Sequence, residues 1–126
     1  MKRFFCMIII LFFFISTAES FWSAPKEFAD IENPILVNDQ SLQKGKAIYF
    51  KNCVKCHGKE GKGDGVTAGS LRIKLPNFSR GLDLDSDGEL FYKVATGRFE
   101  MAPFQLILSN NEIWQSIIFV RSLAKE

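Results

Sequence analysis

The chain has 126 residues and is nearly balanced in charge, with 16 Lys and Arg against 14 Asp and Glu and a formal net charge of +2. This length is that of a single domain with its own buried core. The near-neutral balance gives no support to nucleic-acid binding, which depends on an excess of basic residues. The chain has three cysteines and one histidine, so any site built on them involves very few residues.

The first residues have the pattern of a secretory signal peptide. A basic pair at residues 2–3 precedes an unbroken apolar run at residues 4–15, and small residues suited to cleavage follow. The apolar run is shorter than the roughly 20 residues that a helix needs to span a bilayer. We therefore expect residues 1–20 to be cleaved after Ala18 or Ser20, which would leave the protein in the periplasm. Retention of this segment as a membrane tether is the alternative.

The next residues divide into an arm and a first helix. Residues 21–40 contain two prolines and are predicted to form an extended or irregular N-terminal arm. Residues 41–56 are predicted to form a helix, the first element of a folded domain at residues 41–126. Four residues of that helix fall on one face at helical spacing: Gly45, Tyr49, Cys53 and Cys56.

The segment Cys53-Val54-Lys55-Cys56-His57 has the C-x-x-C-H spacing of covalent haem attachment. Two thiols on one helical turn can form thioethers with the two vinyl groups of one porphyrin, and the histidine that follows can reach the iron. A structural zinc site would need four Cys or His ligands, and a thioredoxin-like pair belongs beside a strand-helix-strand pattern that the sequence lacks. Because Cys6 lies in the expected signal peptide, we predict one covalent haem c on Cys53 and Cys56, with His57 as an iron ligand.

Two loops and a short helical turn are predicted after this motif. Residues 58–65 hold four glycines among charged residues and must form a loop. Residues 67–72 are predicted to form a short turn of helix, and residues 76–78 a loop or turn that is not helical.

Residues 83–88 imitate the start of a calcium-binding EF-hand loop. The twelfth position of such a loop supplies a bidentate Glu, but here it is Val94. Ser86 and Glu89 instead have the spacing of a capping box, in which each side chain accepts a bond from the other residue's backbone N–H. We therefore predict a helix that opens at this box and ends before Gly97, rather than a calcium site.

A last helix is predicted over residues 111–123, with Ser109 or Asn110 as its cap. Apolar side chains occupy well over half of its circumference, so it must be largely buried. These side chains are Ile113, Trp114, Ile117, Ile118, Phe119, Val120 and Leu123. The sequence contains no convincing strand, and the predicted fold class is therefore all-α with three principal helices.

Met101 is the only methionine outside the expected signal peptide, and the chain has no second histidine. It lies between two predicted helices, so a loop can present its thioether to the haem iron. The alternative is that Met101 fills core volume, as methionines often do. A core methionine usually belongs to a periodic helical face, and this one precedes a proline in a loop. We therefore predict that Met101 is the second axial ligand.

Together these motifs resemble those of class I c-type cytochromes, specifically the small bacterial monohaem kind. The resemblance covers residues 41–123 and rests on segments that come in the family's order: Gly45-x-x-x-Tyr49, Cys53-Val54-Lys55-Cys56-His57-Gly58, Gly61-Lys62-Gly63-Asp64-Gly65, Leu75-Pro76-Asn77-Phe78, Gly88-Glu89-Leu90, Gly97, Met101-Ala102-Pro103-Phe104 and Glu112-Ile113-Trp114. It implies three principal helices plus loops wrapped around one covalent haem. One local departure is Ala102, because many relatives place the proline directly after the methionine.

The resemblance also implies two contacts. The carbonyl of Pro76 would accept a hydrogen bond from the ring N–H of His57, which would orient the imidazole and raise its basicity. The first and last helices would cross where Gly45 allows a close approach, near Phe119.

The function implied by the resemblance is one-electron transfer by a protein that is not an enzyme, because His and Met ligation would saturate the iron. Expected partners are redox proteins, namely a donor dehydrogenase or quinol-oxidising complex and an acceptor oxidase or reductase. The carrier is expected to be a monomer that meets membranes only through these partners. Two alternatives are a haem subunit of a larger respiratory enzyme complex, bound through its arm, and a haem-based small-ligand binder whose Met101 detaches.

Charge is unevenly distributed along the chain. Residues 44–74 contain eight basic and two acidic residues, whereas residues 81–100 contain five acidic and two basic ones. Lys44, Lys51 and Lys55 share one face of the predicted first helix. Such an arrangement would orient the protein toward a redox partner; the alternative is that these lysines only solvate the helix.

Overall fold

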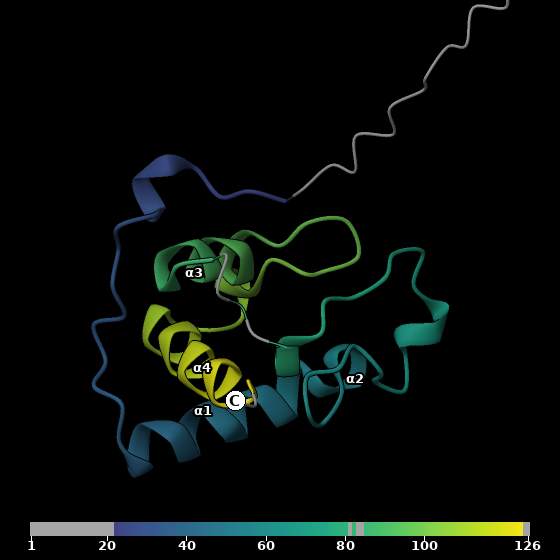
Figure 1. The fold of residues 1–126 in the computed structure, drawn as a ribbon, viewed down its shortest axis with the longest axis horizontal. Helices are drawn as coiled ribbons and strands as arrows, with labels where there is room; N and C mark the ends of the chain where they lie inside the picture. Colours follow the sequence, from purple (N-terminus) through teal and green to yellow (C-terminus); the bar gives the residue numbers. More distant parts are fainter. Residues whose placement is uncertain (1–21, 81, 83–84, 125–126) are drawn as a thin grey trace, which may run out of the picture.

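The structure is a computed structural model that describes residues 22–80, 82 and 85–124 (Figure 1). This part of the chain is helical and contains no β-strand, so the all-α prediction is confirmed. Its α-helices are α1 (Asp39–Asn52), α2 (Val54–His57), α3 (Asp87–Thr96) and α4 (Asn110–Ser122). Single turns of 3₁₀ helix form at η1 (Lys26–Phe28), η2 (Ala68–Ser70), η3 (Phe78–Arg80) and η4 (Phe104–Leu106). The expected signal peptide lies outside the described residues.

Helix α1 begins two residues before its predicted start because Asn38 caps it. The Asn38 side chain accepts a bond from the backbone N–H of Ser41, and the Ser41 hydroxyl accepts one from the backbone N–H of Asn38, each at 2.9 Å. The sequence predicts one continuous helix to residue 56, but α1 ends at Asn52. The φ of −117° at Cys53 departs from the helical value, and α2 then adds one further turn.

Helices α3 and α4 both open with capping boxes. Ser86 caps α3 and pairs with Glu89, as predicted, and Ser109 caps α4 and pairs with Glu112 in the same way. Helix α4 therefore begins one residue earlier than predicted. Helix α3 ends before Gly97, whose φ of 62° is rarely adopted by other residues, so the predicted stop is confirmed.

Helix α4 crosses α1 at Gly45, as the resemblance implies (Figure 1). A Cβ atom on Gly45 would collide with the backbone carbonyl of Gln115 and would lie 3.2 Å from the Cβ of Phe119. Beside the crossing, the fully buried ring of Tyr49 packs against Phe119, with ring centroids 5.1 Å apart. The absence of a side chain at residue 45 is therefore what lets the two helices approach.

An apolar core holds α3 against α4. Its buried members are Leu90, Ala95, Ile113, Trp114 and Ile117. The ring of Phe91 stacks on Trp114, with centroids 4.3 Å apart and 25° between the planes. The predicted burial of the last helix is confirmed, because Ile118 and Phe119 are buried as well.

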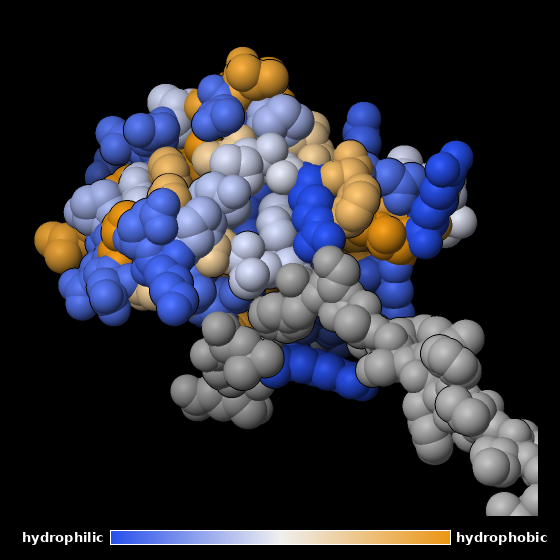
Figure 2. Space-filling model, turned by 90° about the horizontal axis from the view of Figure 1, so that it is seen from above, coloured by the Kyte–Doolittle hydropathy of each residue, from blue (hydrophilic) through white to orange (hydrophobic). Residues whose placement is uncertain are grey.

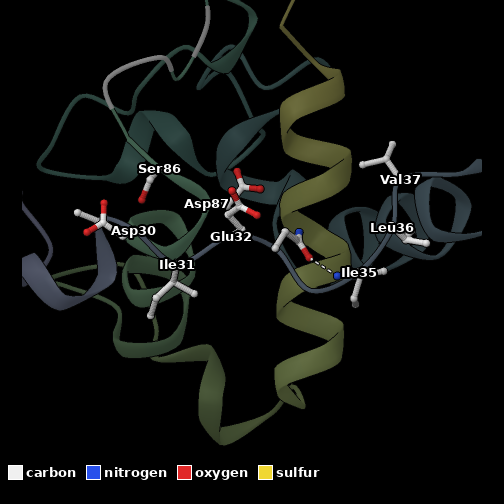
Figure 3. Close-up of a pocket in the computed structure, with 10 residues that line it drawn as sticks. Asp30, Ile31, Glu32, Ile35, Leu36, Val37, Ser86 and Asp87 are labelled. Atoms are coloured by element: carbon white, nitrogen blue, oxygen red, sulfur yellow. Dashed lines mark hydrogen bonds between the residues drawn. The ribbon is translucent and has the colours of Figure 1, made fainter.

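The arm is irregular apart from η1 and packs along α3 and α4. The ring of Phe28 lies 4.9 Å from a tyrosine ring of α3, and the Ile31 carbonyl accepts a bond from the backbone N–H of Gly88 at 2.9 Å. Asn33 donates from its side chain to the Trp114 carbonyl at 3.0 Å. A hollow of about 730 Å³ remains between the arm and the start of α3 (Figure 3). The side of the arm that faces α3 and α4 is therefore occupied by contacts within the chain.

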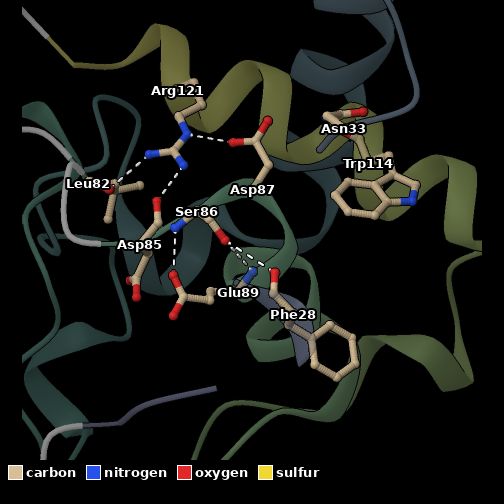
Figure 4. Close-up of polar contacts among 9 residues, drawn as sticks. All are labelled: Phe28, Asn33, Leu82, Asp85, Ser86, Asp87, Glu89, Trp114 and Arg121. Carbon is tan, nitrogen blue, oxygen red and sulfur yellow. Dashed lines mark hydrogen bonds and ion pairs between the residues drawn. The ribbon is translucent and has the colours of Figure 1, made fainter. Parts of the chain in front are cut away.

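Arg121 of α4 holds the segment before α3 in place (Figure 4). Its guanidinium donates to the carbonyls of Leu82 and Asp85, at 2.8 and 2.6 Å, and to the carboxylate of Asp87 at 2.8 Å. The carboxylate of Asp85 pairs with Lys93 at 2.6 Å. Asp85 and Asp87, which belong to the calcium-like pattern, are thus engaged by basic side chains.

The face of the molecule seen in Figure 2 is mainly hydrophilic, and its apolar residues form small separate patches. Among the described residues, no helix has both the length and the apolar character required to cross a membrane. Strongly exposed large apolar side chains occur on the arm, on the loops after α2 and α3, and around η4: Leu36, Val37, Val66, Phe99, Leu106 and Ile107.

Candidate functional site

The C-x-x-C-H residues form one helical turn, which we call the attachment turn. Cys53 begins the turn, and its carbonyl accepts bonds from the backbone N–H groups of Cys56 and His57, at 3.2 and 2.9 Å. Both cysteines are free thiols, and each is partly buried. The structure thus brings two thiols and an imidazole together in the order that covalent haem attachment requires.

The glycine-rich loop folds back onto this turn. Gly63 donates its backbone N–H to the His57 carbonyl at 2.8 Å, and Gly65 donates to the Cys56 carbonyl at 3.0 Å. Gly63 has a φ of 75°, in the left-handed region that favours glycine. Because the last carbonyls of a helix otherwise lack partners, the loop stabilises the attachment turn.

Tyr49 joins the end of the attachment turn to α1. Its hydroxyl donates a hydrogen bond of 2.7 Å to the carbonyl of Gly58. Burial raises the pKa of Tyr49, so its hydroxyl remains a donor throughout the neutral range. A buried tyrosine hydroxyl needs such an acceptor, but the helical pattern predicts only that the ring is buried and not which carbonyl it reaches.

The imidazole of His57 lies against an aromatic ring. Phe78 stacks on it, with ring centroids 4.8 Å apart and 21° between the planes. Burial lowers the pKa of His57, so the imidazole is neutral at pH 7, the form that binds metals. Its Nδ1 atom is buried and has no hydrogen-bond partner among the described residues. A histidine that binds a metal through one ring nitrogen normally donates from the other, so this atom requires an acceptor.

The predicted acceptor, Pro76, lies on a loop that packs against the glycine-rich loop. Its carbonyl oxygen is 3.2 Å from the position that a Cβ atom on Gly63 would take, and Gly63 is itself bonded to the His57 backbone. The structure contains no hydrogen bond between Pro76 and the His57 ring. The role of Pro76 therefore stays a prediction.

Met101 lies on the loop between α3 and η4, outside the buried core cluster. Met101 and Arg98 exchange two backbone hydrogen bonds, each of 3.0 Å, which close this loop into a tight turn. A Cβ atom on Gly97 would collide with the Met101 carbonyl, so the turn also depends on that glycine. The Met101 side chain is partly buried and comes from a different element than the attachment turn.

The Cys53 thiol does not have the character of a reactive redox thiol or of a zinc ligand. Burial, and then the neighbouring Cys56, raise the pKa of Cys53 to about 12, whereas reactive and metal-binding thiols have a lowered pKa. Within the described part of the chain, no group of three or more His, Cys, Asp and Glu residues could hold a metal ion. The zinc and thioredoxin-like alternatives therefore gain no support from the structure.

Two contacts of the site have no counterpart in the sequence predictions. Phe78 is predicted to lie in a loop but begins η3, where the Asn77 side chain accepts a bond from the Ser79 N–H at 3.0 Å. The hydroxyl of Thr67 donates to the Lys55 carbonyl at 2.9 Å and lies 3.2 Å from the Cys56 sulfur. Both residues follow the motif without any periodic pattern, so no sequence signal identifies their contacts.

Comparison with known proteins assigns this chain to a family. The sequence profile of the family described as cytochrome c oxidase, cbb3-type, subunit III matches residues 40–120. No curated protein matches the chain in sequence.

Several solved structures share the fold. A chain of the Kuenenia stuttgartiensis reducing HAO-like protein complex Kustc0457/Kustc0458 is 28% identical with a TM-score of 0.64, and the match covers 75% of this chain and 50% of that one. The KustC0563 c-type cytochrome is 25% identical with a TM-score of 0.56, over 64% of this chain and 98% of that one. Cytochrome CL from the marine methylotrophic bacterium Methylophaga aminisulfidivorans MPT is 23% identical with a TM-score of 0.55, over 68% and 57% of the two chains, and shows the fold alone.

The first of these structural matches is twice as long as the region it shares with this chain, so it bears on the domain and not on the larger protein. The family match spans more than half of the chain, and the attachment turn lies inside it. The chain therefore belongs to the cytochrome c oxidase, cbb3-type, subunit III family and is a class I c-type cytochrome, which binds haem c covalently and transfers electrons.

Proposed function

We propose that the chain is a periplasmic one-electron carrier with a single haem c on Cys53 and Cys56 and with His57 and Met101 as axial ligands. The observation that carries the proposal is the helical turn that presents two thiols and a neutral, buried imidazole together. The signal-peptide pattern at residues 1–20 supports export to the periplasm.

The residues present fit a covalent haem. The two thiols are free and partly buried, and the buried Nδ1 of His57 is available to donate to an acceptor while the other ring nitrogen binds iron. Exposed Val66 and Phe99, on the loops after α2 and α3, supply apolar surface of the kind that a porphyrin packs against. When bound, the haem would supply a reversible one-electron couple.

Five residues of the site would then have distinct parts in this function. Cys53 and Cys56 would hold the porphyrin, and His57 and Met101 would bind the iron, which would leave no open position for a substrate. We propose that the Pro76 carbonyl accepts the His57 N–H and so fixes the orientation of the imidazole. A neutral thioether stabilises the reduced iron relative to harder ligands, which suits a carrier of high reduction potential.

A haem subunit of a larger respiratory complex is the second candidate. The family description names an oxidase subunit, and the HAO-like neighbour belongs to a complex. The arm, however, already packs on α3 and α4 through Phe28 and Asn33. Native size separates the two candidates, because a carrier purified from the periplasm migrates alone and a subunit migrates with its complex.

Covalent attachment is tested by replacing the cysteines. Cys53→Ala and Cys56→Ala should each lose one thioether by mass spectrometry, and the double variant should keep no haem through denaturing electrophoresis. The wild type is the control and should keep both thioethers. Redox titration of the wild type should show one reversible one-electron step per chain. Haem retained by the double variant, or a second haem in the wild type, would contradict the proposal.

A further inference from the structure

Met101 ends a tight turn of four residues that is strained at its second position. Arg98 and Met101 exchange backbone hydrogen bonds of 3.0 Å, so Phe99 and Glu100 are the two central residues. We call residues 98–101 the Met101 turn. Phe99 has a φ of 53°, and within the described part of the chain it is the one residue other than glycine with a positive φ. Two-residue turns favour glycine, asparagine or aspartate at such a position, so a phenylalanine there strains the backbone.

The contacts of Phe99 itself do little to offset this strain. Its side chain is 80% exposed, so burial against other side chains does not compensate. The guanidinium of Arg98 lies 4.6 Å from the centre of the ring, but such a contact contributes only modestly at an exposed site. Strained residues persist only where the surrounding structure holds them in place. The Met101 turn therefore requires contacts with residues outside it.

Glu100 supplies such a contact. Its carboxylate accepts a hydrogen bond of 2.8 Å from the backbone N–H of Arg72, which lies 28 residues earlier in the loop after η2. That loop is itself bonded to the attachment turn, because the backbone N–H and the hydroxyl of Thr67 both donate to the carbonyl of Lys55 at 2.9 Å. Glu100 therefore connects the Met101 turn to a segment that is anchored on the haem attachment site.

We propose that Glu100 is a positioning residue for Met101, because its bond to the Arg72 backbone holds the strained Met101 turn in the conformation that presents the thioether to the haem iron. This inference rests on the proposed axial role of Met101 and names the contact that keeps the ligand in place. A carboxylate that accepts a backbone N–H forms a charge-assisted hydrogen bond, which is stronger than one between neutral groups. Loss of the bond would let the strained turn relax, withdraw Met101 and leave one position on the iron open.

The bond between Glu100 and Arg72 lies apart from the contacts that hold the helices together. Both residues are exposed, whereas the core that joins α3 to α4 is formed by buried apolar side chains of those two helices. Substitution of Glu100 should therefore change the position of the Met101 turn and leave the helix packing intact. This separation makes it possible to test a positioning role without unfolding the protein.

The test measures how readily added imidazole displaces Met101 from the ferric holoprotein. The apparent affinity for imidazole rises in proportion to the fraction of molecules in which the iron position is open. Glu100→Ala should raise this affinity by about tenfold, the effect of losing one hydrogen bond to a charged group. Glu100→Gln keeps an oxygen that can accept the Arg72 N–H and should restore most of the wild-type value. Glu27→Ala is the matched control, because it removes the same charge at an exposed glutamate of the arm, and it should leave the affinity unchanged.

A second pair of variants tests the strain at Phe99. Phe99→Gly and Phe99→Ala both remove the ring, but only glycine adopts a positive φ without strain. The glycine variant should therefore hold the Met101 turn closed more firmly and bind imidazole about threefold more weakly than the alanine variant.

Equal imidazole affinities in Glu100→Ala and Glu27→Ala would overturn the positioning role, and so would a failure of Glu100→Gln to restore the wild-type value. Equal affinities in the two Phe99 variants would overturn the part assigned to strain. Met101→Ala separates these failures from a failure of the proposed function. If Met101→Ala binds imidazole more tightly than the wild type, Met101 competes for the iron, and an unchanged affinity in Glu100→Ala refutes only the role of Glu100. If Met101→Ala and the wild type bind imidazole equally, the axial assignment of Met101 itself is wrong.

Discussion

Tyr49 and Gly58 are joined by a hydrogen bond of 2.7 Å between a buried phenol hydroxyl and a buried backbone carbonyl. Gly58 directly follows His57, and the ring of Tyr49 packs on Phe119 of α4. The bond therefore links the proposed axial imidazole to the crossing of α1 and α4. This single hydrogen bond holds the end of the attachment turn against the packed helices.

Tyr49→Phe should lower the free energy of unfolding of the holoprotein by about 1–3 kcal/mol. The ring still fills its site, but the carbonyl of Gly58 stays buried without its partner. Denaturant titration measures the loss. Tyr92→Phe is the matched control, because the Tyr92 hydroxyl makes no hydrogen bond to the described residues and ought to cost little. Equal losses in the two variants would refute the importance of the bond.

The parts of this structure that the sequence predicts are those encoded locally. The spacing of Ser86 and Glu89 predicts the start of α3, and the apolar pattern of residues 111–123 predicts the burial of α4. The start of α1, at Asp39, is missed by two residues because its capping box uses Asn38 with a serine as the partner instead of the usual glutamate or glutamine. Local rules thus suffice where the stabilising contact lies within a few residues and uses the residue types that the rule expects.

The contacts that the sequence does not predict join distant residues. The stacking of Phe78 on His57 and the docking of Asn33 on Trp114 link segments with no shared periodicity. The break between α1 and α2 falls at Cys53, inside a stretch whose pattern is helical throughout. The ligand set is nonetheless readable from the sequence as a hypothesis, because so few cysteines, histidines and methionines are available.

Phe78→Ala should lower the reduction potential of the haem. Removing the stacked ring admits water beside His57, and a more polar surrounding stabilises the more highly charged ferric iron. Phe78→Tyr keeps the ring and should restore most of the potential. Phe91→Ala removes a ring that stacks on Trp114, so it should lower stability but leave the potential unchanged. Spectroelectrochemical titration compares the reduction potentials of the three variants. A fall of equal size in Phe91→Ala would argue against a specific role of Phe78.

The stability of the protein should decrease as the pH falls below the ordinary pKa of glutamate, and Glu112 should contribute to this decrease. Hydrogen bonds from the backbone N–H and the hydroxyl of Ser109 lower the pKa of Glu112. Its carboxylate therefore stabilises the folded state above the unfolded-state pKa of about 4.3, and this contribution disappears as the pH falls through the lower folded-state value.

Glu112→Gln is the variant that tests this contribution. Its free energy of unfolding should depend less steeply on pH than that of the wild type between about pH 5 and pH 3. Glu27→Gln is the control, since Glu27 makes no hydrogen bond or ion pair with the described residues, and it should leave the pH dependence unchanged. If the free energy of unfolding had the same pH dependence in Glu112→Gln and the wild type, the capping box would not contribute to that dependence.

The last prediction separates an electron carrier from a ligand binder, and it depends on Met101. The wild type should be low-spin in both oxidation states and unreactive toward carbon monoxide at modest concentrations. Met101→Ala should give a high-spin iron that binds carbon monoxide readily, with a lower reduction potential because water stabilises ferric iron better than a thioether does. Met101→His should restore the low-spin state, since imidazole is a strong ligand, while the potential stays below that of the wild type. If the wild type binds carbon monoxide as fast as Met101→Ala, the thioether is not a firm ligand, and small-ligand binding replaces electron transfer as the better account of this protein.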